Sequence, residues 1–420
     1  MSKTSMSQED WNALSFEASQ LFSPFSPVQE HDLFAGRGAQ IRKMIESTSE
    51  RGKHVILFGE RGIGKTSLAK LFASFFPSTL RYIHLYRVQA DPSDNFTSLW
   101  RKLFKDIHIQ IQKTEGSETF AIAQLYENQP ILPDDVRREL SDLFSANHIP
   151  IVVIDEYDKV RDQETHVLMA NTLKALSDEG VNVTVVLVGV ADNVNELVGE
   201  HPSIIRCIEQ VPMPRMNASE SKEILDKIVP RLGMKLDQDA LWKIVNLSRG
   251  LPSYVHTLGL YSVQNAISRK SLTVTEKDVD AAITRALERV EESFRDTYSK
   301  AVHSNRRDNL YREVLLACAL TETDERGTFT PLAVCKPLGA ILRRDKEIEI
   351  AVFQQHLAKF ITPERANVLV QRGRQRAFRY RFDDPMMQPY VILKGIEQGL
   401  VSASATDILS YPAEPRLPSI

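Results

Sequence analysis

The stretch HVILFGERGIGKTSLAKLF, residues 54–72, constrains the fold more than any other part of the chain. Residues 54–58 form a short apolar segment typical of a buried strand, residues 59–66 fit the pattern G-x-x-x-x-G-K-[ST], and residues 67–72 are compatible with a helix. In this pattern the glycines let the backbone curl so that its N–H groups point at phosphate oxygens. The sequence therefore predicts a strand, a phosphate-binding loop and a helix in direct succession.

The loop predicts a site for ATP with Mg²⁺. Lys65 is expected to neutralise the β- and γ-phosphates, and Thr66 to hold Mg²⁺ through its hydroxyl. The nucleotide-binding residues expected in this segment are Gly59, Glu60, Arg61, Gly62, Ile63, Gly64, Lys65, Thr66 and Ser67.

A second segment, PIVVIDEYDKV at residues 150–160, supplies the acidic groups that such a loop requires. Residues 151–154 are apolar on both faces, as in a parallel strand buried between helix layers. Asp155 at the end of this strand is expected to bind Mg²⁺, directly or through water. Glu156 is expected to orient and deprotonate the water that attacks ATP.

Further strands are predicted at residues 81–88, 183–190 and 207–213, with helical stretches between them, among them residues 95–111. Strands that alternate with helices specify a parallel sheet with crossover connections, and ligands bind at the carboxyl ends of its strands. The expected fold class is therefore α/β, with a five-stranded parallel sheet.

Composition narrows the setting. A chain of 420 residues is expected to form two or three domains. Its three cysteines stand far apart in no metal-binding pattern, and no apolar run is long enough to span a membrane, so a cytoplasmic protein without membrane contact is expected. Residues 300–390 carry about +5 of formal charge although the whole chain carries -3. A polyanionic partner should therefore meet the C-terminal third.

At this point the chain resembles the AAA+ ATPases, in the branch of the origin-recognition initiators and many bacterial ATP-binding proteins. LFAGRGAQIRKM, residues 33–44, looks like the box that borders the adenine, which places Phe34, Gly36 and Arg37 near the base. VGVADN, residues 188–193, looks like sensor 1 and places Asp192 near the γ-phosphate or the catalytic water. Residues 201–216 resemble the segment in which the family keeps an arginine finger, here Arg206, which implies an oligomer in the ATP-bound state.

Residues 216–301 read as helices and resemble the helical lid of this family, with a capping box predicted at Thr275 and Asp278. One departure is SRGLPSYVH, residues 248–256, which has Ser253 where sensor 2 would offer an arginine. Arg249 is close, but on the other side of the turn. The GLP turn is similar to that of signal-transducing ATPases with numerous domains, which implies that Pro252 packs near the nucleotide.

The last third ends in a basic ribbon, LVQRGRQRAFRYRF, at residues 369–382. Helices, one of them at residues 349–361, precede a predicted hairpin with its turn at residues 372–374, in an order similar to a winged helix. Phe378, Tyr380 and Phe382 are expected to face the helices. The residues expected to contact the DNA backbone are Arg372, Arg374 and Arg376 at the tip and the outward-facing Arg379 and Arg381. Two alternatives are a contact with protein that keeps the nucleotide module closed, and a solvated edge whose charge prevents aggregation.

The sequence thus predicts five segments: a flexible or docking segment at 1–30, an AAA+ nucleotide-binding αβ domain at 31–215, a helical lid at 216–301, an α+β winged-helix domain at 302–400 and a flexible tail at 401–420. The expected function is that of an ATP-hydrolysing oligomeric switch or loader that binds double-stranded DNA. Two other functions stay open: a signalling ATPase that controls an effector protein of a defence or toxin system, and a transposition regulator that forms filaments on DNA.

Overall fold

A computed structural model describes residues 6–77, 83–113, 116–143, 149–191, 194–198, 202–304, 309–324, 326–344, 348–373 and 378–402. Among these residues no helix is both long enough and apolar enough to cross a membrane.

The predicted five-stranded parallel sheet is present, in the order β2-β5-β6-β1-β7. Its strands are β1 (His54–Phe58), β2 (Ile83–Gln89), β5 (Ile149–Asp155), β6 (Thr184–Gly189) and β7 (Ile208–Pro212). Because β6 lies between β1 and β5, the loops that follow these three strands meet at one edge of the sheet.

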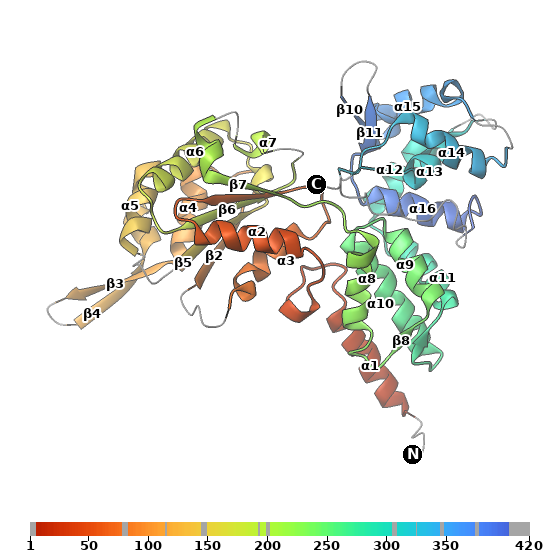
Figure 1. Cartoon of the computed structure of the whole chain (residues 1–420), viewed down its shortest axis with the longest axis horizontal. Helices are drawn as coiled ribbons and strands as arrows, with labels where there is room; N and C mark the ends of the chain where they lie inside the picture. Colours follow the sequence, from red (N-terminus) through yellow and green to blue (C-terminus); the bar gives the residue numbers. More distant parts are fainter. Residues whose placement is uncertain are drawn as a thin grey trace, which may run out of the picture.

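Helices cover both faces of this sheet (Figure 1). They are α2 (Gly38–Ser49), α3 (Lys65–Leu71), α4 (Phe96–Asp106), α5 (Pro133–Leu143), α6 (Gln163–Asp178) and α7 (Asn195–Val198). Alternate residues of each strand enter different cores: Val55 and Leu57 pack with α3 on one face, and Ile56 packs with α4 and α6 on the other. The apolar character of both faces follows from this two-sided cover.

The helix predicted at residues 95–111 is wrong at its C-terminal end. Helix α4 ends at Asp106, and β3 (His108–Lys113) and β4 (Gly116–Ala121) pair as an antiparallel hairpin. Ile107 is already extended, and the sequence HIQIQ alternates with a period of two and contains β-branched residues, which favours a strand. Figure 1 shows this hairpin projecting from the sheet.

The segment at residues 216–301, called the lid below, consists of helices and one short parallel strand pair. Its elements are α8 (Ala218–Ile228), β8 (Lys235–Leu236), α9 (Gln238–Ser248), α10 (Pro252–Ser268), β9 (Thr273–Val274) and α11 (Glu276–Glu288). The last helix of the segment, α12 (Glu292–Val302), packs mainly on the C-terminal part of the chain (Figure 1). The capping box predicted at Thr275 and Asp278 is present. Helix α1 (Gln8–Leu21) lies along α10, so the N-terminal segment docks on the lid (Figure 1).

Residues 302–402, called the C-terminal module below, lie beside the lid (Figure 1). The elements are α13 (Tyr311–Leu320), α14 (Pro331–Ile341), α15 (Gln354–Phe360), β10 (Leu369–Arg372), β11 (Arg379–Phe382) and α16 (Met387–Glu397). Strands β10 and β11 form the predicted antiparallel hairpin. The single helix expected at residues 349–361 is wrong, because a 3₁₀ turn (Ile350–Val352) precedes α15.

Side chains of the hairpin follow the expected alternation in part. Tyr380 and Phe382 are buried, whereas Phe378 is 38% exposed, so the expectation that it faces the helices is wrong. Arg379 does not extend freely outward as expected: it pairs with Asp324 at 3.1 Å and donates to the carbonyl oxygen of Thr328 at 2.9 Å. The segment before α14 pairs with β11, since Phe329 and Tyr380 form a β-bridge, and this brings Thr328 to Arg379.

Candidate nucleotide-binding site

The loop at residues 59–66 joins β1 to α3 and curls tightly at its first glycine. Gly59 has a φ of 150°, and a Cβ there would lie 2.5 Å from the carbonyl oxygen of Met213 and 2.7 Å from Ile63. Only glycine fits this position without a shift of the backbone. Because of this turn, the loop curls around Lys65, which is the first residue of α3.

Lys65 is buried, and its Nζ donates to the carbonyl oxygens of Gly59 at 3.0 Å and Glu60 at 2.6 Å. Burial lowers the pKa of Lys65 to about 8, against the opposing effect of nearby carboxylates, first of all Asp158. The ammonium is therefore still mainly protonated at pH 7, and it can exchange its bonds to the loop for bonds to phosphate oxygens.

Thr66 and Asp155 come together as the sequence predicts for a metal site. Thr66 Oγ1 donates to Asp155 Oδ1 at 3.3 Å, and the backbone N–H of Glu156 donates to the same oxygen at 2.9 Å. Asp155 is only 1% exposed. A hydroxyl and a carboxylate that face each other beside a phosphate-binding loop are hard oxygen donors of the kind that Mg²⁺ prefers, so these residues fit Mg²⁺ bound with ATP.

Glu156 lies next to Asp155 in a left-handed backbone conformation, with a φ of 56°. Its Oε2 accepts hydrogen bonds from Lys159 Nζ at 2.7 Å and from the side-chain amide of Gln89. Burial alone would raise the pKa of Glu156, but the bonds from Lys159 and Gln89 outweigh it and lower that pKa. The side chain is thus an ionised carboxylate at pH 7, the form that a general base requires.

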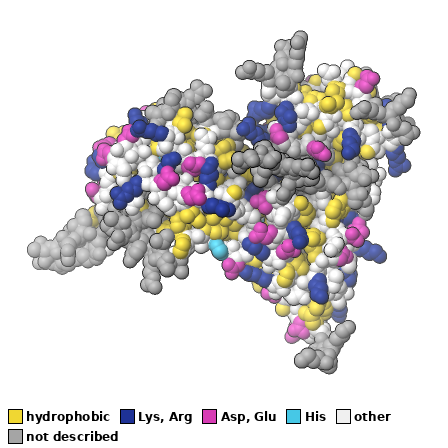
Figure 2. All heavy atoms as spheres, in the orientation of Figure 1, with side chains coloured by type: hydrophobic (Ala, Val, Ile, Leu, Met, Phe, Trp, Pro, Cys, Tyr) yellow, Lys and Arg dark blue, Asp and Glu magenta, His cyan; other side chains and the backbone are white. Residues whose placement is uncertain are grey.

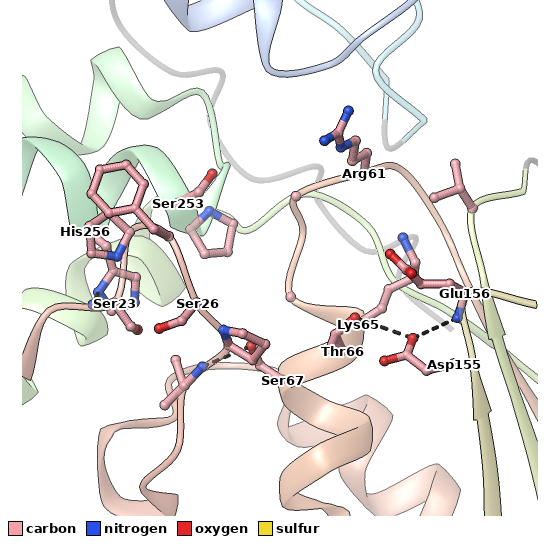
Figure 3. Close-up of a pocket in the computed structure, with 18 of the residues that line it drawn as sticks. Ser23, Ser26, Arg61, Lys65, Thr66, Ser67, Asp155, Glu156, Ser253 and His256 are labelled. Atoms are coloured by element: carbon pink, nitrogen blue, oxygen red, sulfur yellow. Dashed lines mark hydrogen bonds between the residues drawn. The ribbon is translucent and has the colours of Figure 1, made fainter. Parts of the chain in front are cut away.

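These residues line a cavity of about 620 Å³ between the lid and the part of the chain that contains the five-stranded sheet, called the core below. Figure 3 shows Lys65, Thr66, Asp155 and Glu156 on one side and Ser253 and His256 of α10 on the other. Arg61, Gly62, Gly64, Ser67 and Pro252, which are expected from the sequence to bind the nucleotide, also line the cavity. The volume suffices for a nucleotide, because ligand sites typically enclose about 300–1,000 Å³.

The N-terminal segment at residues 23–28 forms a further wall of the cavity, which the sequence did not reveal. The backbone N–H of Val28 donates to Ser67 Oγ at 3.2 Å, and that of Ser23 donates to His256 Nδ1 at 3.3 Å (Figure 3). Burial lowers the pKa of His256 to about 4, so this imidazole is neutral and can accept that bond. The sequence offers little indication that His256 lies at this site, because a lone histidine in an apolar helix belongs to no recognisable motif.

A second cavity of about 30 Å³ adjoins the first. Residues expected near the nucleotide line it: Phe34, Arg37 and Pro252 from the family resemblance, and Ile63, Gly64 and Ser67 from the loop motif. The backbone N–H groups of Gly36 and Arg37 donate to Glu223 and Glu220 of α8, both at 3.0 Å, and Arg37 Nη2 donates to the carbonyl oxygen of Ile63 at 3.1 Å. This segment therefore bonds the lid to the loop.

Two predicted site residues, Asp192 and Arg206, and Arg249 beside the GLP turn remain to be placed. Asp192 falls outside the described residues. Arg206, on the turn before β7, is exposed and pairs with Asp178 at the end of α6, and it does not line the cavity of its own chain. Arg249 is buried and donates to the carbonyl oxygens of Leu320 at 2.9 Å and Thr321 at 3.2 Å, so it bonds the lid to the C-terminal module.

The loop itself also contacts the C-terminal module. Glu60 accepts two bonds from Arg215, at 2.6 Å from Nε and 3.3 Å from Nη2, and Arg215 Nη1 also donates to the side chain of Gln388. Arg61 lies 3.3 Å from Asp384 Oδ2. A Cβ on Gly62, whose φ is 81°, would lie 2.7 Å from Met386 Sδ. Arg61 and Gly62 therefore lie against the residues just before α16, and Glu60 is linked to Gln388 of α16 through Arg215.

The basic hairpin of β10 and β11 belongs to the same module, and β11 ends two residues before Asp384, the partner of Arg61. Arg372 ends β10 and is exposed, Arg381 is partly exposed, and Arg374 and Arg376 fall outside the described residues. Figure 2 shows Lys and Arg side chains interspersed with Asp and Glu over the face in view.

Residues 48–198 match the family model described as an AAA domain. A Walker-type ATPase from Pyrococcus abyssi has a similar solved structure, with a TM-score of 0.53 and 17% identity over 89% of this chain and 99% of that one. Cdc6p from Pyrobaculum aerophilum has a TM-score of 0.46 and 12% identity over 91% and 99% of the two chains. The ORC1 protein from Aeropyrum pernix, solved in complex with DNA, has a TM-score of 0.45 and 17% identity over 90% and 96%. No curated protein sequence matches the chain. The chain thus has an α/β P-loop AAA+ fold, as the sequence predicted.

Proposed function

We propose that this protein is an ATP-hydrolysing switch in which nucleotide occupancy of the loop controls the position of the C-terminal module. The observation that carries the proposal is the bonding of the loop residues Glu60 and Arg61 to that module through Arg215, Gln388 and Asp384. A change in the loop is thereby transmitted to α16 without any intermediate domain.

The residues of the site have distinct parts in this proposal. Lys65 and the loop N–H groups hold the phosphates of ATP, and Thr66 and Asp155 hold Mg²⁺, which supplies charge neutralisation at the phosphates when bound. Glu156 accepts a proton from the attacking water once its carboxylate turns away from Gln89 and Lys159. Lys65 releases the carbonyl oxygens of Gly59 and Glu60 when it turns to phosphate, and this alters the loop at Glu60.

A distance measurement tests the switch. Dyes on Glu127→Cys in the core and Glu364→Cys in the C-terminal module sit on exposed positions, while the three native cysteines are buried and free. We expect energy transfer between the dyes to change on addition of ATP and Mg²⁺. Glu156→Gln should bind ATP and show the change without hydrolysis, whereas Lys65→Ala should show the change only at an ATP concentration about 10–100-fold higher. Nucleotide binding without any change in energy transfer would refute the switch.

Oligomer formation belongs to the same proposal. Arg206 is exposed, pairs with Asp178 and does not line the cavity of its own chain, so its role in this proposal is to reach the nucleotide of a neighbouring copy. Arg206→Ala should leave ATP affinity within about twofold and slow hydrolysis by on the order of 10³-fold or more if it acts as a finger. Hydrolysis at the wild-type rate would remove Arg206 from the mechanism.

A DNA-binding function has its own support in the hairpin, whose position after the lid fits the winged-helix expectation. Arg372 is exposed and Arg381 partly exposed, and Arg379 pairs with Asp324. Changing Arg372, Arg374 and Arg376 together to Ala should lower duplex affinity and flatten its salt dependence, by about 0.9 in the log–log slope for each phosphate that the variant no longer neutralises. Arg51, Arg137 and Arg138 of the core, changed together, are the matched control.

A regulatory ATPase that controls an effector protein is the second candidate. The intrachain contact of Glu60 and Arg61 with the C-terminal module favours it, because such a contact keeps the nucleotide module closed in a single chain. An unchanged DNA-binding curve for the arginine variants, together with the nucleotide-dependent distance change, would select this function over a DNA loader or a filament-forming transposition regulator.

A further inference from the structure

Arg87 on β2 contacts the carboxylate that we assign to Mg²⁺. Its Nη2 lies 2.7 Å from Asp155 Oδ2, in an ion pair whose side chains are 29% and 2% exposed. No sequence motif singles out this arginine. It reaches Asp155 because β2 and β5 are parallel neighbours in which Gln89 lies opposite Asp155, so Arg87, two residues earlier, extends along the same face of the sheet.

The two oxygens of Asp155 have different partners. Oδ1 accepts from Thr66 Oγ1 and from the backbone N–H of Glu156, while Oδ2 accepts from Arg87. The guanidinium therefore fixes the rotation of the carboxylate, and the oxygen that it leaves available is the one beside the Thr66 hydroxyl. A carboxylate with only the Oδ1 partners could rotate about its terminal torsion, which is broad for Asp.

The negative charge of nearby carboxylates also favours the position of the Arg87 guanidinium. Asp155, Glu156 and Asp158 all line the cavity, together with Lys65 and Lys159. Lys65 bonds to the loop carbonyls, and Lys159 pairs with Glu156. Among the described side chains, Arg87 is the cation bonded to Asp155, and its own Nε has no hydrogen-bond partner there. Asp155 therefore provides the directional contact that orients this guanidinium.

We propose that Arg87 is a positioning residue for Mg²⁺: by holding Asp155 Oδ2 it presents Asp155 Oδ1 to the metal beside Thr66. This inference rests on the proposed binding of ATP with Mg²⁺ and adds a residue to it from a strand outside the loop. Partners that orient a metal ligand typically contribute about 10–100-fold to metal affinity.

Titration of a fluorescent ATP analogue, with EDTA and then with increasing Mg²⁺, tests the proposal in the full chain. For Arg87→Met we expect an affinity within about twofold of wild type in EDTA, but a Mg²⁺ midpoint at least about tenfold higher. Arg87→Lys retains the charge with a less directional donor, so its Mg²⁺ midpoint should lie between those of wild type and Arg87→Met. This variant keeps the test valid if the methionine variant unfolds. Arg137→Met, which removes an arginine paired with Glu179 at 2.7 Å far from Asp155, should match wild type.

Two outcomes would contradict the positioning role of Arg87, and a third would refute the ATP site on which it rests. An unchanged Mg²⁺ midpoint in both Arg87 variants would show that Asp155 needs no positioning. A lower midpoint would show that the guanidinium competes with the metal, which is the opposite of positioning. Failure of the wild-type protein to bind the analogue with or without Mg²⁺ would instead refute the proposed ATP site itself.

Discussion

Replacing Arg215 by Met is the most direct test of the contact between the loop and the C-terminal module. Arg215 and Glu60 form an ion pair with side-chain exposures of 5% and 9%, and the same guanidinium bonds to Gln388 of α16. Gln388 in turn donates to the carbonyl oxygen of Ala319 at 2.8 Å, which links the pair to α13. Removing Arg215 leaves the Glu60 carboxylate buried without its counter-ion.

Breaking a buried ion pair by deleting one partner costs about 3–5 kcal/mol. Arg215 bonds to Glu60 and Gln388, which lie outside the strands of the sheet, so its loss should leave the sheet folded. We therefore expect the cost to shift mainly the equilibrium between the C-terminal module packed on the loop and the module detached from it. At about 1.4 kcal/mol per factor of ten, that equilibrium should shift by about a hundredfold or more toward the undocked state.

Hydrogen exchange followed by mass spectrometry measures this shift by region. In Arg215→Met the amides of α16, Met387–Glu397, should exchange faster by about the same factor, while those of β5 and β6 should keep wild-type rates. The double variant Glu60→Gln with Arg215→Met should be less destabilised than the sum of the two single variants. Equal protection of α16 in Arg215→Met and in the control Arg137→Met would refute the view that this ion pair holds the module.

Three further predictions concern the site and its supports. Lys65→Ala should weaken ATP binding by about 10–100-fold in a calorimetric titration, since a charged hydrogen bond contributes about 1.5–3 kcal/mol, and wild-type affinity would exclude Lys65 from the phosphate site. Burial lowers the pKa of His54 and His256 to about 4 from 6.5, so the unfolded chain binds more protons and stability should fall from pH 6.5 toward pH 4, by about 2 kcal/mol per histidine at pH 5. Urea unfolding at pH 7 and pH 5 measures this loss, which should be smaller in His256→Asn; an equal loss would contradict the assignment. Asn217→Ala should destabilise the lid by about 1 kcal/mol in the same assay, because Asn217 caps α8, and an unchanged unfolding midpoint would show that the cap contributes nothing.

Local sequence was sufficient for the parts of the fold that depend on neighbouring residues. The strands of the sheet, the loop at residues 59–66, the capping box at Thr275 and the hairpin of β10 and β11 all follow from apolar periodicity, glycine spacing or cap chemistry. The error at residues 107–111 arose where a helical and an alternating pattern run into each other without a glycine or proline between them.

Contacts between segments that are distant in the sequence could not be predicted from such local patterns. Arg379 deviates from the outward direction expected of it because it bonds to Asp324 and Thr328, on another segment. The wall formed by residues 23–28 likewise depends on α1 lying along α10.

The sequence by itself predicted the chemistry that we propose for the site, because a glycine-rich loop followed by Lys65 and Thr66 and a strand ending in Asp155 and Glu156 are recognised by residue type and spacing. Only the tertiary structure decided what surrounds that chemistry: Arg87 reaches Asp155 across two parallel strands, and Arg215 ties Glu60 to α16. Both contacts join residues at least 68 positions apart. No local preference of the chain encodes such pairs, since they form only when the sheet and the C-terminal module have packed.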